Sequence, residues 1–352
     1  MEIWKNIKYS FWRFFALRKI NLNYEFHDYE FKLAESIDEY FQAFQVLYDS
    51  YFELGFTEQT PSKTYIVFQH LLPSTALLIA KYKGEVVGTV SLVRESKMGL
   101  PIQKYISLQL KKDFNTRYAE ISSLCIKKSF RQSKQGNVFF PLLAFMYQFA
   151  TKHFDVSDFI IAVYPRHEIY YRGLMGFQRL HDTFEFYGAP ALALRLNLKN
   201  AYSFFAEKYG QLAESRNLLY YFTEYQFREF NFNLPSKNTL QTAPLSAHIL
   251  KTFIQLRPSL KTQIMQDHLM VLLSSLPIKE RHKFIDYIVS DLIRSTSRYD
   301  VSISGKLKVN DLLFINCKVM NITNQGMLIQ LDNLVEALVE NHEYSLVLDA
   351  PL

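Results

Sequence analysis

Hydrophobic and polar positions form two different patterns in the first third of the chain. Residues 36–56, SIDEYFQAFQVLYDSYFELGF, follow a helical pattern. Ser36 precedes this helix as a candidate N-cap, and Glu39 stands three residues later, which is the spacing of a capping box. Residues 76–93, ALLIAKYKGEVVGTVSLV, then form two β-rich runs on either side of YKGE, which predicts a hairpin.

The following stretch alternates between predicted strands and predicted helices. Pro141 falls in the first turns of one apolar helix, where proline is tolerated, and Gly176 closes a second, shorter helix. The strands are predicted at 118–126, 158–164 and 191–198, and the helices at 137–154 and 167–177. This order predicts an α+β fold in which helices flank a mixed sheet.

The second half of the chain contains a region with a helical pattern followed by a region with a β pattern. Residues 200–294 are mainly helical in pattern, and β-rich runs occupy most of 300–349. A chain of 352 residues is too long for one ordinary core, so several domains are expected.

Composition narrows the class of protein. Apolar residues make up 49% and charged residues 21%, the balance of a folded soluble protein, and 16% aromatic residues suggest large apolar grooves. The net charge of +6 favours acidic partners such as anionic lipid or an acidic carrier protein, whereas no zinc finger or aromatic RNA-binding signature supports nucleic acid. Cys125 and Cys317 lie in apolar runs, and no metal-ligand spacing occurs, so two reduced core thiols and no metal are expected.

The first 22 residues are basic and aromatic. Charges interrupt this segment, so it lacks the apolar core of a signal peptide, and no run elsewhere is long enough to span a membrane. Trp4, Ile7, Phe11 and Phe15 would share one face of a helix. Two interpretations stand side by side: a helix lying on an anionic membrane surface, or a helix packed on its own protein. The expected location is the cytoplasm, with association at the inner face of the membrane under the first interpretation.

The loop between the predicted strand 118–126 and the helix after it has the composition of an anion site. Amides at a helix N-terminus attract anions, and glycine lets the backbone approach closely. Arg131, Gly136 and Asn137 occupy this turn and resemble the Arg/Gln-x-x-Gly-x-Gly loop of the GNAT acyltransferase fold, except that Lys134 replaces the first glycine.

Five motifs in order extend this resemblance. They are VVGTVSLV, GLPIQKYI, AEISSLCI, VYPRHEIYYRGLMGF and GAPALALRL. Together they resemble the N-acyl amino acid synthase family, which is related to the acyl-homoserine lactone synthases within the GNAT fold, over roughly Phe52 to Leu198. The lactone synthases often carry an arginine where this chain has Ser123, which argues against a lactone product.

The resemblance implies a substrate pair. Members of this family move a fatty acyl group from acyl carrier protein to the amine of an amino acid. A carrier protein has an acidic surface, which Lys134, Arg131, Lys127 and Lys128 would complement. The alternative is that these lysines belong to a solvated loop.

Aminolysis of a thioester needs a base for the amine, help for the oxyanion and a proton for the thiol. Glu120 is the predicted general base, with Ser122 on the same strand face as a substrate contact. Tyr170 or Tyr171, beside His167, would protonate the thiolate. Arg166 or Arg172 would clamp the carboxylate of the amino acid. The alternative for each is a structural role: an ion pair, packing or solvent exposure.

The C-terminal segment carries a second pair of motifs. Arg294 and Arg298 form Arg-x-x-x-Arg, and NITNQG supplies Asn321, Thr323 and Gly326. The pair resembles the PilZ domain, a small β-barrel that binds cyclic di-GMP. Arginines can stack on guanines and contact phosphates, which suits this ligand. The segment is shorter than a usual PilZ domain, so the expectation is either a truncated domain or a barrel with fewer strands.

Four parts are therefore expected. They are a basic aromatic segment (1–22), a GNAT-like N-acyltransferase domain (23–200), a helical connector (201–293) and a PilZ-like domain (294–352). The leading hypothesis is an N-acyltransferase that uses acyl carrier protein and is regulated by cyclic di-GMP. Two alternatives stay open: a non-catalytic cyclic di-GMP effector with a degenerate acyltransferase domain, and an acetyl-CoA-dependent N-acetyltransferase.

Overall fold

The structure is a computed structural model of the chain. It describes residues 12–13, 22, 28–96, 99–108, 110, 116–131, 138–224, 231–234, 246–264, 269, 272–273, 276–289, 299–308, 314–323, 326–331 and 345–348. The chain divides into two compact units, Met1–Leu260 and Lys261–Leu352. The helical segment expected at 201–293 is therefore divided between the two units.

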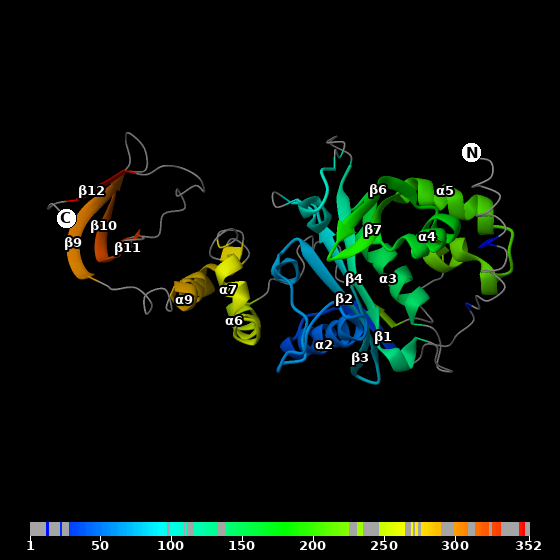
Figure 1. Ribbon diagram of the computed structural model, residues 1–352, viewed down its shortest axis with the longest axis horizontal. Helices are drawn as coiled ribbons and strands as arrows, with labels where there is room; N and C mark the ends of the chain where they lie inside the picture. Colours follow the sequence, from blue (N-terminus) through cyan, green and yellow to red (C-terminus); the bar gives the residue numbers. More distant parts are fainter. Residues whose placement is uncertain are drawn as a thin grey trace. The chain divides into compact units, whose positions relative to one another are not determined.

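A mixed sheet of eight strands organises the first unit (Figure 1), and the strand order is β6-β7-β5-β4-β3-β2-β1-β8. Neighbouring strands are antiparallel except for β4 with β5 and β1 with β8. The strands are β1 (Tyr29–Leu33), β2 (Thr75–Tyr82), β3 (Glu85–Arg94), β4 (Tyr118–Ile126), β5 (Asp158–Val163), β6 (Gln178–Phe186), β7 (Ala189–Asn197) and β8 (Asn231–Asn233). The predicted hairpin and the three predicted strands are confirmed, while β1, β6 and β8 were not predicted, and β8 falls in the stretch expected to be mainly helical.

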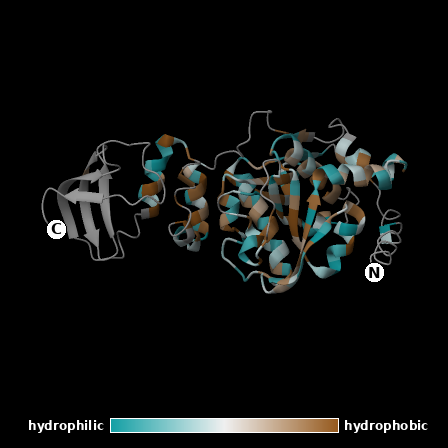
Figure 2. Ribbon diagram, turned by 90° about the horizontal axis from the view of Figure 1, so that it is seen from above, coloured by the Kyte–Doolittle hydropathy of each residue, from teal (hydrophilic) through white to brown (hydrophobic). Residues whose placement is uncertain are grey.

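Helices cover both faces of this sheet. Figure 1 shows α2 on one side and α3, α4 and α5 on the other, and Figure 2 shows the hydrophobic strands between them. The helices are α2 (Ile37–Glu53), α3 (Phe139–Lys152), α4 (Glu168–Met175), α5 (Leu198–Tyr209) and α6 (Ala247–Leu256), with short turns η1 (Phe68–Leu71), η2 (Pro101–Lys104), η3 (Lys128–Phe130), η4 (Pro165–His167), η5 (Glu214–Arg216) and the π-helical η6 (Tyr220–Glu224).

The helix signals in the sequence form as expected. The Ser36 hydroxyl accepts the Glu39 N–H, and the Glu39 carboxylate accepts the Ser36 N–H, so the predicted capping box is confirmed. Gly176 follows α4 with φ +78°, in the left-handed region that favours glycine. Pro141 lies in the first turn of α3.

The second unit contains α9 (Ile278–Val289) and a four-stranded antiparallel sheet in the order β11-β10-β9-β12, while α7 (Ser259–Gln263) lies at the division between units. The strands are β9 (Tyr299–Lys308), β10 (Phe314–Thr323), β11 (Gly326–Leu331) and β12 (Ser345–Leu348). In the described strands β11 and β12 form the two edges and do not pair with each other. The described part is therefore an open sheet, and the expected closed β-barrel is not seen.

Candidate active site

The main pocket of the first unit lies where β4 and β5 separate. The two parallel strands pair from Tyr118 and Asp158 to Ile121 and Ile161. Beyond these residues β4 continues to Ile126 and β5 to Val163 without further pairing to each other. The gap opens at the carboxyl ends of two parallel strands, where ligands commonly bind in open α/β sheets.

A pocket of about 280 Å³ occupies this gap. Consecutive residues of both strands form its floor, and α2, the segment before η1, and the β6–β7 hairpin supply its aromatic walls. The lining residues are Tyr51, Leu54, Phe56, Tyr65, Val67, Glu120, Ile121, Ser122, Ser123, Leu124, Cys125, Ile161, Ala162, Val163, Tyr164, His167, Tyr171, Phe186, Tyr187 and Ala191. The predicted site residues Glu120, Ser122, His167 and Tyr171 thus come together in one pocket.

A β-bulge shapes the floor of the pocket. On β3, one residue separates Thr89 from Ser91, whereas on β4 two residues, Ser123 and Leu124, separate their partners. Ser123 has φ +55°, a left-handed conformation that is uncommon for residues other than glycine. The bulge removes Ser123 and Leu124 from the β3 ladder just where β5 has also moved away. Bulges frequently re-aim side chains beside active sites.

Glu120 is the buried carboxyl group of the pocket. Its side chain is 1% exposed and accepts a hydrogen bond of 2.7 Å from the Ile102 N–H of η2. Burial raises the pKa of Glu120 to about 8, although the Ile102 hydrogen bond opposes this. A carboxyl group with a pKa near neutrality can exchange protons with a bound substrate.

A second polar group in the pocket centres on Ser123. The Ser123 hydroxyl lies 3.1 Å from His70 Nε2 and 3.4 Å from the Ser122 hydroxyl. His70 comes from η1 and stacks on Phe44 of α2, with 5.2 Å between ring centroids. Burial lowers the pKa of His70 to about 3, and the charge of Arg257 adds to this effect. His70 is therefore neutral at physiological pH.

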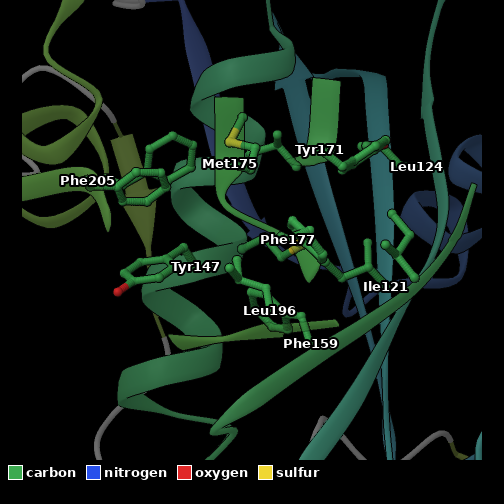
Figure 3. Close-up of a pocket in the computed structure, with 13 residues that line it drawn as sticks. Ile121, Leu124, Tyr147, Phe159, Tyr171, Met175, Phe177, Leu196 and Phe205 are labelled. Carbon is green, nitrogen blue, oxygen red and sulfur yellow. The ribbon is translucent and has the colours of Figure 1, made fainter. Parts of the chain in front are cut away.

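An apolar cavity of about 40 Å³ lies beside the main pocket, between the sheet and helices α3, α4 and α5 (Figure 3). Ile121, Leu124, Ile161 and Tyr171 line both cavities, so the two meet where β4 and β5 separate. Figure 3 shows side chains such as Tyr147, Phe159 and Phe205 gathered around the inner cavity. These walls offer only apolar and aromatic contacts, which suits a hydrocarbon chain.

The predicted residues near α4 fall into two groups. His167 and Tyr171 line the main pocket, and burial raises the pKa of Tyr171 to about 12. His167 Nε2 accepts the Arg166 Nε–H at 3.3 Å. In this arrangement the proton of the neutral His167 ring lies on Nδ1, which can donate a hydrogen bond. Burial, followed by the charge of Arg166, lowers the pKa of His167.

The remaining predicted residues of this region lie outside the pocket lining. Tyr170 is 52% exposed and packs edge-on against Trp12 of the N-terminal segment, with 4.7 Å between ring centroids. Arg172 forms an ion pair of 2.9 Å with Glu168, one turn earlier on α4. Arg166 lies over the Tyr164 ring at 5.3 Å. In this geometry neither arginine contributes to the pocket wall, and the carboxylate clamp stays a prediction.

The predicted donor loop is described only at its start. Arg131 holds the end of β4 against α2: its Nε donates to the Ile126 carbonyl at 2.9 Å, and its guanidinium contacts Ser50 and Glu53. Lys128 also pairs with Glu53, and Lys127 pairs with Glu85. These residues, apart from Ile126 and Glu85, line an open groove of about 640 Å³. Lys134, Gly136 and Asn137 lie outside the described residues.

The predicted nucleotide site is described in part. Arg294 and Arg298 lie outside the described residues. Asn321 and Thr323 belong to β10, and Thr323 is the register partner of Gly326 at the start of β11. The NITNQG motif therefore spans a hairpin between two strands, and cyclic di-GMP binding stays a prediction.

The N-terminal segment is described at Trp12, Arg13 and Leu22. Arg13 Nε donates to the Gly173 carbonyl at 2.7 Å, and its guanidinium lies 5.3 Å from the centre of the Phe204 ring. With the Trp12 contact to Tyr170, these interactions favour packing on the protein for this part of the segment. The stripe of Trp4, Ile7, Phe11 and Phe15 lies outside the described residues.

Several pocket residues had no signal in the sequence. Tyr51 and Tyr65 line the pocket but lie in no motif. His70 also lies in no motif, and tertiary structure alone brings it to Ser123, which is 53 positions away in the chain. Ser123 itself had a signal, because it departs from the pattern of the lactone synthases. Within the described residues, no three His, Cys, Asp or Glu side chains group as metal ligands, and no helix is long and apolar enough to cross a membrane.

Comparison with known proteins finds a match in the first unit. A family model described as N-acyl amino acid synthase FeeM matches residues 42–197, which is less than half of the chain. None of the curated proteins matches the sequence.

Three solved structures illustrate the structural similarity. FeeM, an N-acyl amino acid synthase from uncultured soil microbes, is 17% identical, and the match covers 50% of this chain and 93% of that chain with a TM-score of 0.40. The AHL synthase LasI is 12% identical, with 48% and 89% covered and a TM-score of 0.39. The CoA-dependent acyl-homoserine lactone synthase BjaI, solved with MTA, is 14% identical, with 53% and 91% covered and a TM-score of 0.41.

The family match confirms the resemblance predicted from five sequence motifs over roughly the same residues. It coincides with the part of the sheet that holds Glu120, Ser123 and the gap between β4 and β5. Residues 42–197 accordingly resemble the family described as N-acyl amino acid synthase FeeM.

Proposed function

We propose that the first unit is an N-acyltransferase that moves an acyl group from a thioester to the amine of an amino acid. The main support is the pocket in the gap between β4 and β5, which contains a buried carboxyl group and meets an apolar cavity. The donor's reacting carbonyl would lie in the main pocket beside Glu120. Its hydrocarbon chain would pass beside Ile121 and Ile161, beyond the end of the β4–β5 pairing, into the inner cavity.

The chemistry follows from the groups in the pocket. The ionised Glu120 carboxylate takes a proton from the attacking amine, which makes the nitrogen nucleophilic toward the thioester carbonyl. The bulge at Ser123 and Leu124 lies outside strand pairing on both sides, so its backbone N–H groups are candidates to stabilise the oxyanion. The carbon–sulfur bond then breaks, the amide forms and the sulfur takes up a proton.

The inner cavity is smaller than a fatty acyl chain, so a long donor must displace some of its walls. Methionine side chains at Met146 and Met175 are flexible and can repack around such a chain. This arrangement supports long acyl groups over acetyl groups, because an acetyl group would leave the inner cavity unused.

We also propose, from the sequence, that the donor is an acyl carrier protein thioester and that cyclic di-GMP regulates the enzyme. The ion pairs of Lys127 and Lys128 with acidic residues of this chain reduce the local positive charge, so Lys134 becomes the key cation for carrier recognition. The PilZ-like motifs support the regulatory part of the proposal.

One experiment tests the function and its alternatives. The full chain is incubated with long-chain acyl carrier protein, long-chain acyl-CoA or acetyl-CoA, together with the common amino acids, with and without cyclic di-GMP. We expect N-acyl amino acids, detected by mass spectrometry, with long-chain donors. Product with acetyl-CoA alone would support an acetyltransferase, and cyclic di-GMP binding without any product would support a non-catalytic effector.

A variant assigns the reaction to the pocket. Glu120→Gln keeps an oxygen that can accept the Ile102 N–H but cannot act as a base. We expect turnover to fall about 100-fold or more, the usual contribution of a general base, while the protein stays folded with a melting temperature no lower than that of the wild type. Unchanged turnover would remove Glu120 from the mechanism.

A further inference from the structure

Helix α6 lies outside the residues that match the family model, yet it packs against a helix that walls the pocket. The match ends at residue 197, whereas α6 spans Ala247–Leu256 and belongs to the first unit. Phe253 of α6 is fully buried, and its ring packs edge-on against Phe44 of α2 with 5.0 Å between ring centroids. The same ring lies 5.8 Å from that of Tyr40, one turn earlier on α2. These contacts fix α6 to α2.

Arg257 follows directly after α6 and extends this contact to another segment. Its Nη1 donates to the Ile66 carbonyl, and its Nε donates to the Ser259 hydroxyl at 3.3 Å. Ile66 is 1% exposed, so its carbonyl needs a hydrogen-bond partner from the protein. Arg257 supplies this partner from 191 positions further along the chain.

The segment around Ile66 forms one wall of the pocket. Tyr65 and Val67 line the pocket, whereas Ile66 between them is buried and does not line it. Such alternation is typical of extended backbone, in which neighbouring side chains point in opposite directions. The Tyr65 N–H donates to the Phe44 carbonyl of α2 at 3.0 Å. The wall is therefore held by α2 at one residue and by Arg257 at the next.

The position of this wall favours contact with the acceptor amino acid. Neither Tyr65 nor Val67 lines the inner cavity, where the hydrocarbon chain of the donor would lie. The backbone of the wall joins α2 at Phe44, whereas the start of the donor loop contacts α2 at Ser50 and Glu53. The helical rise separates these points by about 9 to 14 Å along α2. The wall is thus removed from both ends of the donor, and the amino acid is the substrate that remains.

We propose that Arg257 is a positioning residue that holds Tyr65 and Val67 where the acceptor amino acid binds. This inference rests on the proposed acyl transfer. It extends the functional site beyond the family match, because an arginine next to α6 then fixes part of the pocket. Arg257 does not line the pocket itself. Its loss should therefore weaken binding of the amino acid and leave the chemical step intact.

The kinetic test varies the group that meets the Ile66 carbonyl. Arg257→Met keeps an apolar stem and removes every donor, whereas Arg257→Lys keeps a cation that can donate to the carbonyl. With a saturating long-chain thioester, we expect Arg257→Met to raise KM for the amino acid about 10-fold and to change kcat by no more than about twofold. Arg257→Lys should recover most of this loss. An unchanged KM for the amino acid, or an equal loss in kcat, would overturn the proposal.

Two controls separate positioning from a general loss of stability. Arg94 is a matched arginine of the first unit, because it donates to the Phe154 carbonyl at 3.3 Å and does not line the pocket. Arg94→Met should lower the melting temperature and keep the wild-type KM for the amino acid. In Arg257→Met, the preference among acyl chain lengths should stay that of the wild type, since the wall does not line the inner cavity. A raised KM in Arg94→Met, or a shifted chain-length preference in Arg257→Met, would overturn the proposal.

Amide hydrogen exchange tests the wall without any turnover. The Tyr65 N–H is bonded to the Phe44 carbonyl, so its exchange rate reports whether the wall stays on α2. We expect Arg257→Met to speed exchange at Tyr65 about 10-fold or more, while Val90 in the middle of β3 keeps its wild-type rate. An unchanged rate at Tyr65 would overturn the proposal.

The two measurements also distinguish this inference from the function on which it rests. If the wild type transfers no acyl group from any thioester, the proposed function fails and the acceptor role of the wall fails with it. If the wild type is active and Arg257→Met keeps the wild-type KM for the amino acid, only the role of Arg257 fails.

Discussion

Replacing Glu120 by glutamine tests how the buried carboxyl group of the pocket changes the free energy of unfolding with pH. Glu120 is 1% exposed, and glutamine preserves an acceptor for the Ile102 N–H. The variant therefore removes the titrating group while changing the packing very little. Its consequence for stability can be worked out with sign and size.

The pKa of Glu120 is raised from 4.5 to about 8 by burial. In the unfolded chain the carboxyl loses its proton near the lower value, so between these two pH values folding takes up a proton. The stability that the neutral Glu120 contributes is fully present below pH 4.5 and is lost as pH rises through about 8. The stability changes by about 1.4 kcal/mol per pH unit, which gives about 5 kcal/mol between the two pKa values. This figure is an upper limit, because water that enters the pocket lowers the cost of burying the charged carboxylate.

Chemical denaturation of both proteins across this pH range measures the difference. Trp12 packs against Tyr170 in the first unit, so its fluorescence reports on the unit that contains Glu120. We expect Glu120→Gln to become progressively more stable than the wild type as pH rises and then to level off above about pH 8. Glu120→Asp retains a carboxyl group and should keep a pH-dependent slope. Parallel curves for the wild type and Glu120→Gln would refute the reasoning.

Three further predictions concern the fold and the cavity. Gly176→Ala should lower the free energy of unfolding by more than Gly188→Ala, because both glycines have positive φ but only at Gly176 would the new Cβ lie 2.8 Å from the Phe204 ring; thermal melting compares them, and equal losses would contradict this account. Ser36→Ala should cost about 1 kcal/mol in the same measurement by removing the cap of α2, and no loss would show that the capping box is dispensable. Leu124→Trp should shift the donor preference toward shorter acyl chains, measured as the ratio of products from a series of thioesters, because Leu124 lines both cavities; an unchanged preference would exclude the inner cavity as the acyl site.

The fold could be predicted where local signals were strong. The Ser36–Glu39 box, the apolar strand 118–126 and the helix-ending Gly176 each depend on a few neighbouring residues. β6 was missed because its residues are mostly exposed or half-buried and lack a regular alternation. β1 alternates regularly, but it is only five residues long and lies in a mixed region of sequence.

The site was predicted in part for a similar reason. Glu120 and Ser122 belong to one strand motif, so the sequence alone placed them on the same strand. The contact between His70 and Ser123 depends on how η1 packs beside β4, which no local pattern encodes. The pairing of Arg172 with Glu168 was accessible from their four-residue spacing on a helix, and it is a competing role for an arginine expected to bind substrate.

The short pairing between β4 and β5 has a mechanical consequence. Only four residue pairs join these strands, whereas the antiparallel pairs on either side are longer, so the sheet consists of two panels connected by a narrow joint. A ligand that fills the gap bridges the panels and restrains their relative twisting. Binding of a thioester should therefore slow amide hydrogen exchange in both panels, including strands such as β2 that contribute no residue to the pocket wall.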